Sequence, residues 1–348
     1  MKESKVLFVG LGGAGQRHLR ILKQLLPEDT AFTAFRRTAK TPFLRADFTV
    51  DEKHSVADTY QLTVFDTLVS AFEDKPNLTV ISTPTSCHRE PLMLAMQAGS
   101  GVIVEKPWAE DLEDFKAFCK GMLEKKLPFL ISFQRRYHPL IAKAKQFISA
   151  GKIGKPIVAT FTVFSDVTTW HGYEDWRTLY AVRKDLGGGV LLTEIHEIDL
   201  AYWFFGLPKA VYCTGGNRGP EKLDVEDTVQ MTLLYDFFSV QITLCFMHKK
   251  RMRHFHIAGT EGALSWNEEN NKLVFTSFAE EPEEFTAPSF TNDSMFIAQA
   301  EHFLSTWNTK DSEESLSAAG ASLAIVEAAR NSMKSGKVEN IDQSILSN

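Results

Sequence analysis

Hydrophobic residues in the first third of the chain form short runs, and the segments between these runs carry apolar stripes at helical spacing. Leu19, Leu22 and Leu26, for example, share one stripe of the segment that follows the first run. The runs are typical of buried parallel strands and occupy residues 6–9, 31–35, 78–83, 101–104 and 128–133. Strands that alternate with helices predict an α/β fold with a doubly wound parallel sheet.

The pattern changes at about residue 133. After a helical segment at 140–148, alternating strands follow one another with short turns, which predicts a large open, mostly antiparallel sheet. These strands occupy residues 156–165, 211–214, 227–235, 239–247, 254–259, 263–266 and 272–276. Closing helices are expected within 296–335. We therefore expect two domains, 1–132 and 133–348, of which the second is an α+β domain.

The composition is that of a soluble globular protein. Of 348 residues, 44% are hydrophobic and 24% are charged, and the net charge is −6. This balance argues against nucleic acid as a main partner, and the short basic run at 248–256 is interpreted as a solvated strand edge or loop. Four scattered cysteines suit reduced thiols, and no segment approaches the ~18 apolar residues of a membrane span, so we expect a cytoplasmic protein without membrane partners.

A glycine-rich turn follows the first apolar run. Gly10, Gly12 and Gly15 have the G-x-G-x-x-G spacing, with Gly13 and Ala14 between them. The first glycine permits a tight turn, the second lets the backbone touch a pyrophosphate, and the third lets the next helix pack closely on the strand. The phosphates then lie at the positive end of that helix. Its place between strand and helix favours a dinucleotide-binding site over a plain glycine-rich turn, and 1–132 is interpreted as a Rossmann domain.

Two arginines occupy the position that determines the preference of a dinucleotide-binding fold for NAD or NADP. Arg36 and Arg37 follow the second strand, about 20 residues after Gly15. An acidic residue there would bind the ribose 2′-hydroxyl of NAD and repel a 2′-phosphate, whereas a guanidinium can bind that phosphate with two hydrogen bonds. The pair favours NADP(H), with NAD(H) as the other possibility. The alternative is that both arginines are solvated loop charges.

Two further turns should lie at the carboxyl edge of the same sheet, where ligands of this fold bind. Thr83 and Pro84 follow the third strand and lead to His88, which is either a proton carrier or a helix-capping and packing residue. Glu105 and Lys106 follow the fourth strand and precede Pro107. An ammonium at this edge could stabilise negative charge that develops on a substrate oxygen. A surface lysine before a helix-starting proline is the alternative.

A third candidate group lies in the second domain, after three glycines at 187–189. Thr193, His196 and Asp199 recur every three residues beside an apolar helical stripe, so a hydroxyl or a carboxylate could orient the imidazole. A neutral imidazole can accept a substrate hydroxyl proton at neutral pH. A buried structural histidine is the alternative. His254 and His256 share a strand face but have no ligand partners at suitable spacing, so no metal site is expected.

In order and spacing these motifs resemble the Gfo/Idh/MocA family (glucose-fructose oxidoreductase, inositol dehydrogenase, MocA). The resemblance covers nearly the whole chain and rests on 10–15, 83–84 with His88, 105–107, 135–139, 187–189 with His196 and Asp199, and Gly259 with Gly262. It implies a Rossmann domain followed by a domain whose open sheet often mediates dimers or tetramers. It also implies pyridine-nucleotide oxidoreduction of sugars or cyclitols, with Lys106 and His196 at the reacting hydroxyl.

One position departs from the family pattern. The family commonly has Asp four residues before the histidine, where this chain has Leu192, so the residue that orients His196 is left open. The variant motif is similar to that of members associated with surface-sugar and nucleotide-sugar pathways.

Two functions of different class follow from these residues. The first is an NAD(P)-dependent dehydrogenase or reductase for a secondary hydroxyl or ketone of a sugar, cyclitol or sugar nucleotide. His196 would exchange the proton, Lys106 would stabilise the alkoxide, and Arg135, Arg136 and Tyr137 would orient substrate or close the cleft, beside Thr193 and Asp199. The second is a catalytically silent dinucleotide sensor on the same fold, which would need neither Lys106 nor His196.

Overall fold

The chain folds into two compact units in the computed structural model, which describes residues 4–37, 42–309 and 312–346. Unit 1 comprises the chain up to Ser132 together with Gly172–Glu174 and Phe296–Ala319. Unit 2 comprises Phe133–His171, Asp175–Met295 and the chain from Gly320. The division into functional domains at residues 132 and 133 stays a prediction. Residues 296–319, which we expected in the second domain, pack with unit 1.

Unit 1 is built on a six-stranded sheet in the order β5-β2-β1-β6-β7-β8, with every neighbouring pair parallel. The strands are β1 Lys5–Val9, β2 Ala31–Phe35, β5 Thr63–Phe65, β6 Leu78–Ile81, β7 Gly101–Val104 and β8 Phe129–Ile131. The chain runs outward from β1 in both directions, so the strand order reverses between β1 and β6. The predicted doubly wound parallel sheet is confirmed, and ligands of such sheets bind at the carboxyl ends of the strands beside this reversal.

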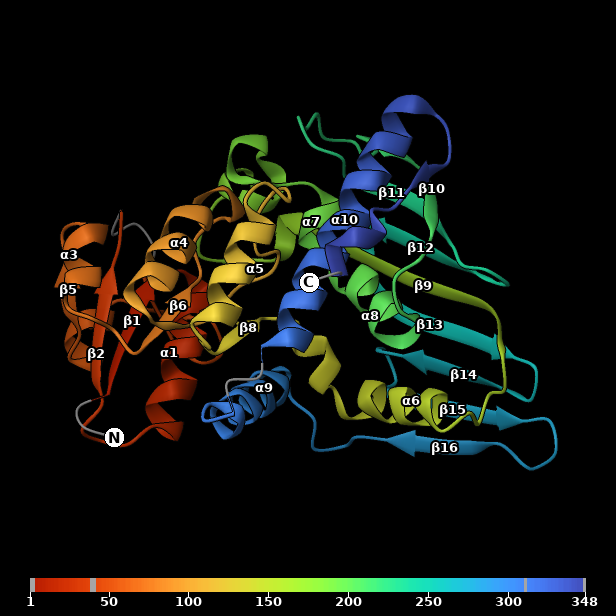
Figure 1. Cartoon of the computed structure of the whole chain (residues 1–348), viewed down its shortest axis with the longest axis horizontal. Coiled ribbons are helices and arrows are strands. Elements are labelled where there is room, and N and C mark those ends of the chain that lie inside the picture. Colours follow the sequence, from red (N-terminus) through yellow and green to blue (C-terminus); the bar gives the residue numbers. More distant parts are fainter. Residues whose placement is uncertain (1–3, 38–41, 310–311, 347–348) are drawn as a thin grey trace. The chain divides into compact units, whose positions relative to one another are not determined.

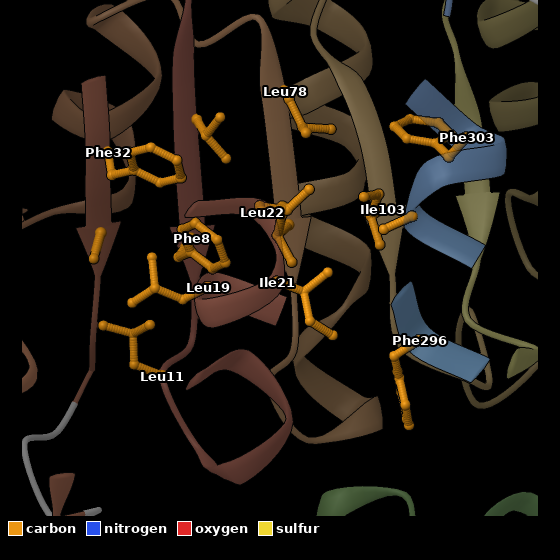
Figure 2. Close-up of a cluster of buried hydrophobic side chains, with 14 of the residues drawn as sticks. Phe8, Leu11, Leu19, Ile21, Leu22, Phe32, Leu78, Ile103, Phe296 and Phe303 are labelled. Atoms are coloured by element: carbon orange, nitrogen blue, oxygen red, sulfur yellow. The ribbon is translucent and has the colours of Figure 1, made fainter. Parts of the chain in front are cut away.

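Helices and short strands complete unit 1 (Figure 1). They are α1 Gly13–Leu25, α2 Val56–Tyr60, α3 Leu68–Glu73, α4 Arg89–Ala98, α5 Phe115–Glu124 and the hairpin β3 Phe43–Leu44 with β4 Val50–Asp51. Helix α9 (Asn292–Thr306) joins this core from the other end of the chain. In Figure 2, Phe296 and Phe303 of α9 lie near Ile103 in the cluster that also holds Leu22 of α1. This apolar contact explains why the closing segment packs with unit 1.

Unit 2 contains a nine-stranded sheet in the order β16-β15-β14-β13-β9-β12-β11-β10-β17. Its strands are β9 Pro156–Asp166, β10 Ala210–Gly216, β11 Thr228–Leu234, β12 Ser239–Cys245, β13 Met247–Gly259, β14 Gly262–Asn267, β15 Lys272–Ser277, β16 Glu283–Thr286 and β17 Glu339–Asn340. All neighbouring pairs are antiparallel except β9 and β12. The predicted open, mostly antiparallel sheet is confirmed.

Burial alternates along the strands of unit 2, so the sheet has one buried face and one more open face. Helix α6 (Pro139–Ser149) packs on β14 and β15, and α8 (His196–Phe205) packs on β9 and β12 (Figure 1). The short helix α7 (Val190–Thr193) packs on β11 and β12. Helix α10 (Glu313–Ser335) begins in unit 1 and enters unit 2 at Gly320, before β17. The buried face of the sheet therefore carries the helix that begins at His196.

The basic run at 248–256 lies within the long strand β13, which pairs with both β9 and β14. Residues 248–251 are exposed, as the interpretation of a solvated segment requires. Arg253 is different, because it occupies an inward-facing position and is only 5% exposed. One cation of this run is therefore part of the core of unit 2.

The contact between α1 and the sheet depends on Gly15. A Cβ atom on Gly15 would lie 2.5 Å from the carbonyl oxygen of Gly10 and 2.5 Å from Oγ of Ser82. Both distances are far below a normal contact, so a larger residue would push α1 away from the ends of β1 and β6.

We therefore expect Gly15→Ala to lower the free energy of unfolding by about 1–3 kcal/mol, the usual cost of overpacking. Gly12→Ala is the matched control, because nothing lies within 4 Å of its Cβ position and its backbone is extended. Urea unfolding of the two variants and the wild type measures the difference. Equal stability of both variants would contradict the close contact.

Candidate active site

The glycine turn in unit 1 has the form that a bound pyrophosphate requires. Gly10 has a φ of +92°, and its Cβ position lies 3.1 Å from the backbone carbonyl group of Ser82. Gly12 precedes the first residue of α1, and the space at its Cβ position is open. The first turn of α1 has no acidic side chain that would repel a phosphate. The positive helix end is thus accessible to an anion at the turn itself.

Thr83 lies beside this turn at the end of β6. Its methyl carbon is 3.1 Å from the Cβ position of Gly10. Its hydroxyl oxygen is buried and has no hydrogen-bond partner among the residues that the structure describes. An unsatisfied buried hydroxyl is costly in an isolated protein, and a ligand at the turn would satisfy it. Thr83 therefore fits the predicted cofactor site, and Pro84 starts the short 3-10 helix Thr85–Cys87 next to it.

His88 connects two of the predicted motifs. Its ring is 1% exposed, with Nδ1 at 3.0 Å from the carbonyl oxygen of Pro107 and Nε2 at 2.8 Å from that of Thr83. Burial lowers the pKa of His88 in spite of these carbonyl groups. Both ring nitrogens therefore face backbone oxygens that join the Thr83 turn to the Glu105–Pro107 segment, an arrangement that supports the packing interpretation.

Glu105 and Lys106 follow β7, and the peptide bond between Lys106 and Pro107 is cis. The carboxylate of Glu105 lies 2.9 Å from Nε2 of His18 in α1. Burial raises the pKa of Glu105, but the hydrogen bond from His18 and the charges of His18, Lys106 and Arg17 outweigh it, so the net pKa is lowered. The buried carboxylate is therefore ionised and anchors the lysine segment to the helix of the glycine turn. His18 is one turn beyond the motif, and no feature of the sequence singled it out.

Arg36 and Arg37 lie at the end of β2, as expected. Arg36 is half-buried, and burial lowers the pKa of its guanidinium. Arg37 is exposed and lines a cavity of about 420 Å³. The cavity is also lined by Ser86, Cys87, Arg89, Glu90, Met93 and Asp114. Arg89, which sequence reasoning missed, forms ion pairs of 3.0 Å with Glu113 and Asp114.

In unit 2, His196 is the first residue of α8 and is 5% exposed. The ring of Phe133 meets the imidazole edge-on with centroids 6.2 Å apart. Nε2 of His196 lies 3.5 Å from Nε2 of Gln134, a residue that we had not singled out. Thr193 ends α7, and its side chain is buried near this break between the two helices.

The three glycines before α7 allow this helix to sit against two other segments. A Cβ on Gly188 would overlap the carbonyl oxygen of Tyr180, and one on Gly189 would overlap the carboxylate of Glu226. The backbone carbonyl of Glu226 accepts a hydrogen bond from the N–H of Val190 at 2.9 Å, and its carboxylate accepts one from the N–H of Leu191 at 3.2 Å. The glycine motif therefore fixes the start of α7, and through it the position of His196.

The arginines after Phe133 form buried ion pairs. Arg136 donates two hydrogen bonds, of 2.7 and 3.0 Å, to the carboxylate of Asp199, which is fully buried. Arg135 lies 2.9 Å from Glu268. Tyr137 is half-buried beside them. Direct contact of Arg135, Arg136, Tyr137, Thr193 or Asp199 with substrate stays a prediction, and the pair between Arg136 and Asp199 ties this segment to α8.

Arg253 binds the residues on both sides of His196. Its guanidinium lies 2.5 Å from Glu194 and 3.2 Å from Glu197, and Ser165 donates a hydrogen bond to Glu194 at 3.2 Å. Burial raises the pKa of Glu197 to about 7; Arg253 opposes the shift, whereas the charge of Glu194 adds to it. Sequence reasoning missed this cluster, although Arg253 has the same strand parity as the apolar Phe255 and Ile257.

Among its described residues the chain has neither a membrane-spanning helix nor a cluster of metal-binding side chains. Across 4–37, 42–309 and 312–346, no helix has the length and apolar character needed to cross a membrane. Among the same residues, no group of three or more His, Cys, Asp or Glu side chains could hold a metal ion.

Family models match both parts of the chain. The model described as an oxidoreductase family with an NAD-binding Rossmann fold matches residues 4–133, and the one described as the GFO/IDH/MocA C-terminal domain matches residues 141–265.

Individual relatives match shorter stretches. Levoglucosan dehydrogenase of Pseudarthrobacter phenanthrenivorans is 27% identical over 235 residues, which are 59% of this chain and 60% of that protein. The scyllo-inositol 2-dehydrogenase (NAD(+)) of Bacillus subtilis is 33% identical over 127 residues, 36% of this chain and 34% of the relative. The chain thus spans 60% or less of the length of these curated relatives.

Similarity of fold extends further than similarity of sequence. The solved structure of levoglucosan dehydrogenase with NADH and levoglucosan superposes with a TM-score of 0.82 at 20% identity. The superposition covers 98% of this chain and 100% of that one, which shows that both have the same fold.

Proposed function

Because the chain belongs to the GFO/IDH/MocA oxidoreductase family, we propose that it is a pyridine-nucleotide dehydrogenase for a secondary hydroxyl of a sugar, a cyclitol or a sugar nucleotide. The observation that carries the proposal is the position of Lys106. It follows a strand of the sheet that bears the glycine turn, next to a buried carboxylate that is bonded to α1. The names of the relatives, which include a levoglucosan and an inositol dehydrogenase, support this substrate class.

The proposed chemistry uses two side chains of this chain. The cofactor, when bound, supplies the acceptor for the hydride of the carbinol carbon. The imidazole of His196 accepts the hydroxyl proton, and the ammonium of Lys106 stabilises the negative charge that develops on the oxygen. In the direction of ketone reduction the same two groups donate, His196 as the acid and Lys106 as a hydrogen-bond donor. Arg135, Arg136 and Tyr137, with Thr193 and Asp199, complete the proposed substrate side.

Lys106→Ala should lower kcat by about 10²- to 10⁴-fold, the usual contribution of one general acid–base or charge-stabilising group, and His196→Asn should do the same. Turnover is measured on a panel of polyols, anhydrosugars and sugar nucleotides, and cofactor affinity is measured by fluorescence titration. Lys120→Ala is the control, because this lysine is exposed on α5.

Full turnover of Lys106→Ala with unchanged cofactor affinity would contradict the mechanism. If the wild type binds cofactor tightly but turns over no member of the panel, the chain is better described as a dinucleotide sensor.

We also propose that the cofactor is NADP(H). Arg36 and Arg37 directly follow β2, and Arg37 reaches the cavity beside the first turn of α4. The cavity is also lined by Arg89, with Glu90 and Asp114, and Arg89 is paired with Asp114. A 2′-phosphate would be bound there by charge-assisted hydrogen bonds. Two relatives use the other cofactor pair, NAD(H). The inositol dehydrogenase is named for NAD(+), and the solved structure of levoglucosan dehydrogenase is a complex with NADH.

The double variant Arg36→Ala with Arg37→Ala should weaken NADPH binding by about 10- to 100-fold, the value of one or two hydrogen bonds to a charged group, and leave NADH binding unchanged. Titration of both cofactors against wild type and variant tests this. Lys75→Ala removes one exposed cation elsewhere in unit 1 and serves as the control. Equal or tighter binding of NADH by the wild type would overturn the assignment.

We further infer that two copies associate through the more open face of the unit 2 sheet. This face presents threonine and glutamine side chains of β9, β11 and β12, and exposed Val158 and Tyr212 lie on it. A broad face of small and weakly polar residues suits an interface between like copies. Sedimentation should give two or four times the 39.1 kDa of one chain, as expected for a dimer or a tetramer.

Gln241→Arg would bring a like charge into such an interface and should produce monomers, whereas Glu281→Arg, in an exposed loop, should not. A wild-type protein that sediments as a monomer at micromolar concentration would contradict this inference.

A further inference from the structure

A group of side chains surrounds Gly13 in unit 1, and the dinucleotide motif does not account for it. The Cβ position of Gly13 lies 3.0 Å from the hydroxyl oxygen of Tyr173 and 3.1 Å from the ring of Phe48. Tyr173 belongs to the segment Gly172–Glu174 that packs with unit 1. A phenol hydroxyl therefore lies close to the first residue of α1.

Arg17 lies on the same side of α1 as Gly13, because residues four apart in a helix share one face. The Cα–Cβ bonds of a helix tilt toward its N-terminus, so the side chain of Arg17 is directed back toward the glycine turn. Its guanidinium lies 4.6 Å from the centroid of Phe48 and 4.5 Å from that of Phe296. Two aromatic rings thus hold the charged group in a fixed position near the helix end.

The electrostatic surroundings agree with this geometry. The charge of Arg17 helps to lower the pKa of Glu105, so the guanidinium is within reach of the segment that holds Lys106. Burial raises the pKa of Tyr173, and the charge of Glu174 and a hydrogen bond to its carboxylate add to this shift, against a smaller effect of Arg17. The phenol therefore stays protonated at neutral pH, and donation to a phosphate would replace its bond to Glu174.

We propose that Arg17 and Tyr173 bind the pyrophosphate of the cofactor together with the backbone of the glycine turn. The inference rests on the proposed binding of a pyridine nucleotide. A pyrophosphate carries two negative charges, and the helix end alone offers only a partial positive charge. A guanidinium one turn behind Gly13 supplies a full charge with directional donors, and the phenol beside Gly13 supplies a further donor. Phe48 and Phe296 then serve to orient Arg17.

Binding of ADP-ribose, which contains the pyrophosphate but not the nicotinamide, tests the proposal by calorimetry without any turnover. Arg17→Met should raise the Kd about 10- to 100-fold, and Tyr173→Phe should raise it about tenfold, as expected for hydrogen bonds to a charged group. Arg17→Met should also flatten the dependence of Kd on salt, because one cation that faces the phosphates is lost. A role in folding alone would not change the salt dependence.

Two matched controls are available. Arg20→Met removes the same charge from the same helix, but Arg20 donates a hydrogen bond to the carbonyl of Leu44 and is 6.0 Å from Phe48. Tyr235→Phe removes a phenol oxygen in unit 2 that donates a hydrogen bond to the carbonyl of Gly206. Neither should change the Kd more than about twofold, well below the value of a charged hydrogen bond. Arg17→Lys keeps the charge without the planar group and should give an intermediate Kd.

The outcomes separate this inference from the proposed function. A wild type that binds neither ADP-ribose nor NADPH contradicts both. A wild type that binds ADP-ribose, with Arg17→Met and Tyr173→Phe folded and equally tight, overturns only the inference. If Arg17→Met does not fold, Tyr173→Phe and Arg17→Lys decide, and unchanged Kd values in both would overturn it.

Discussion

The close approach of α1 to the ends of β1 and β6 is the constraint on which the nucleotide side of the protein depends. Only a hydrogen atom fits at Gly15, between the carbonyl of Gly10 and the hydroxyl of Ser82. This contact fixes the direction of α1 and therefore where its positive end points. It also places His18 within 2.9 Å of Glu105, so the segment that carries Lys106 is attached to the same helix. One steric requirement in the motif thus positions both the anion-binding end and the proposed catalytic lysine.

In unit 2 the equivalent constraint is electrostatic. Asp199 is fully buried, and a buried carboxylate without a partner would cost several kcal/mol, so its two hydrogen bonds with Arg136 are required. The same reasoning applies to Arg253, which is 5% exposed and lies between Glu194 and Glu197. These pairs hold the residues before, after and one turn beyond His196. Burial of charge therefore makes the start of α8 intolerant of displacement. The proposed role of His196 needs such a fixed position, because an imidazole that takes a hydroxyl proton has to meet it in one orientation.

Local patterns in the sequence were sufficient to predict both sheets and the glycine turn. The apolar runs, the glycine turn and the alternating strands predicted both sheets, because these features depend on neighbours in the sequence. Partners distant in sequence were not predictable. Glu268, which pairs with Arg135, is 133 residues away, and Phe296 joins a core formed mainly by residues before 131. The burial of Arg253 was missed for a different reason. Its cationic neighbours at 249–251 suggested a solvated run, although Arg253 alternates in phase with the apolar residues Phe255 and Ile257 and so faces inward. Arg89 gave no sequence pattern at all.

The burial of Leu192 explains why this chain lacks an aspartate at the position where the family commonly has one. Leu192 is fully buried in α7, where a carboxylate would need a partner of its own. The nearby carboxylates of Glu194 and Glu197 are bound by Arg253, and that of Asp199 is bound by Arg136. The position of His196 is set by its backbone, through Glu226 at the start of α7 and Arg253 at the helix break, and its ring is limited by Phe133 and Gln134. These contacts limit the position of His196 and the orientation of its ring, although the aspartate common in the family is missing.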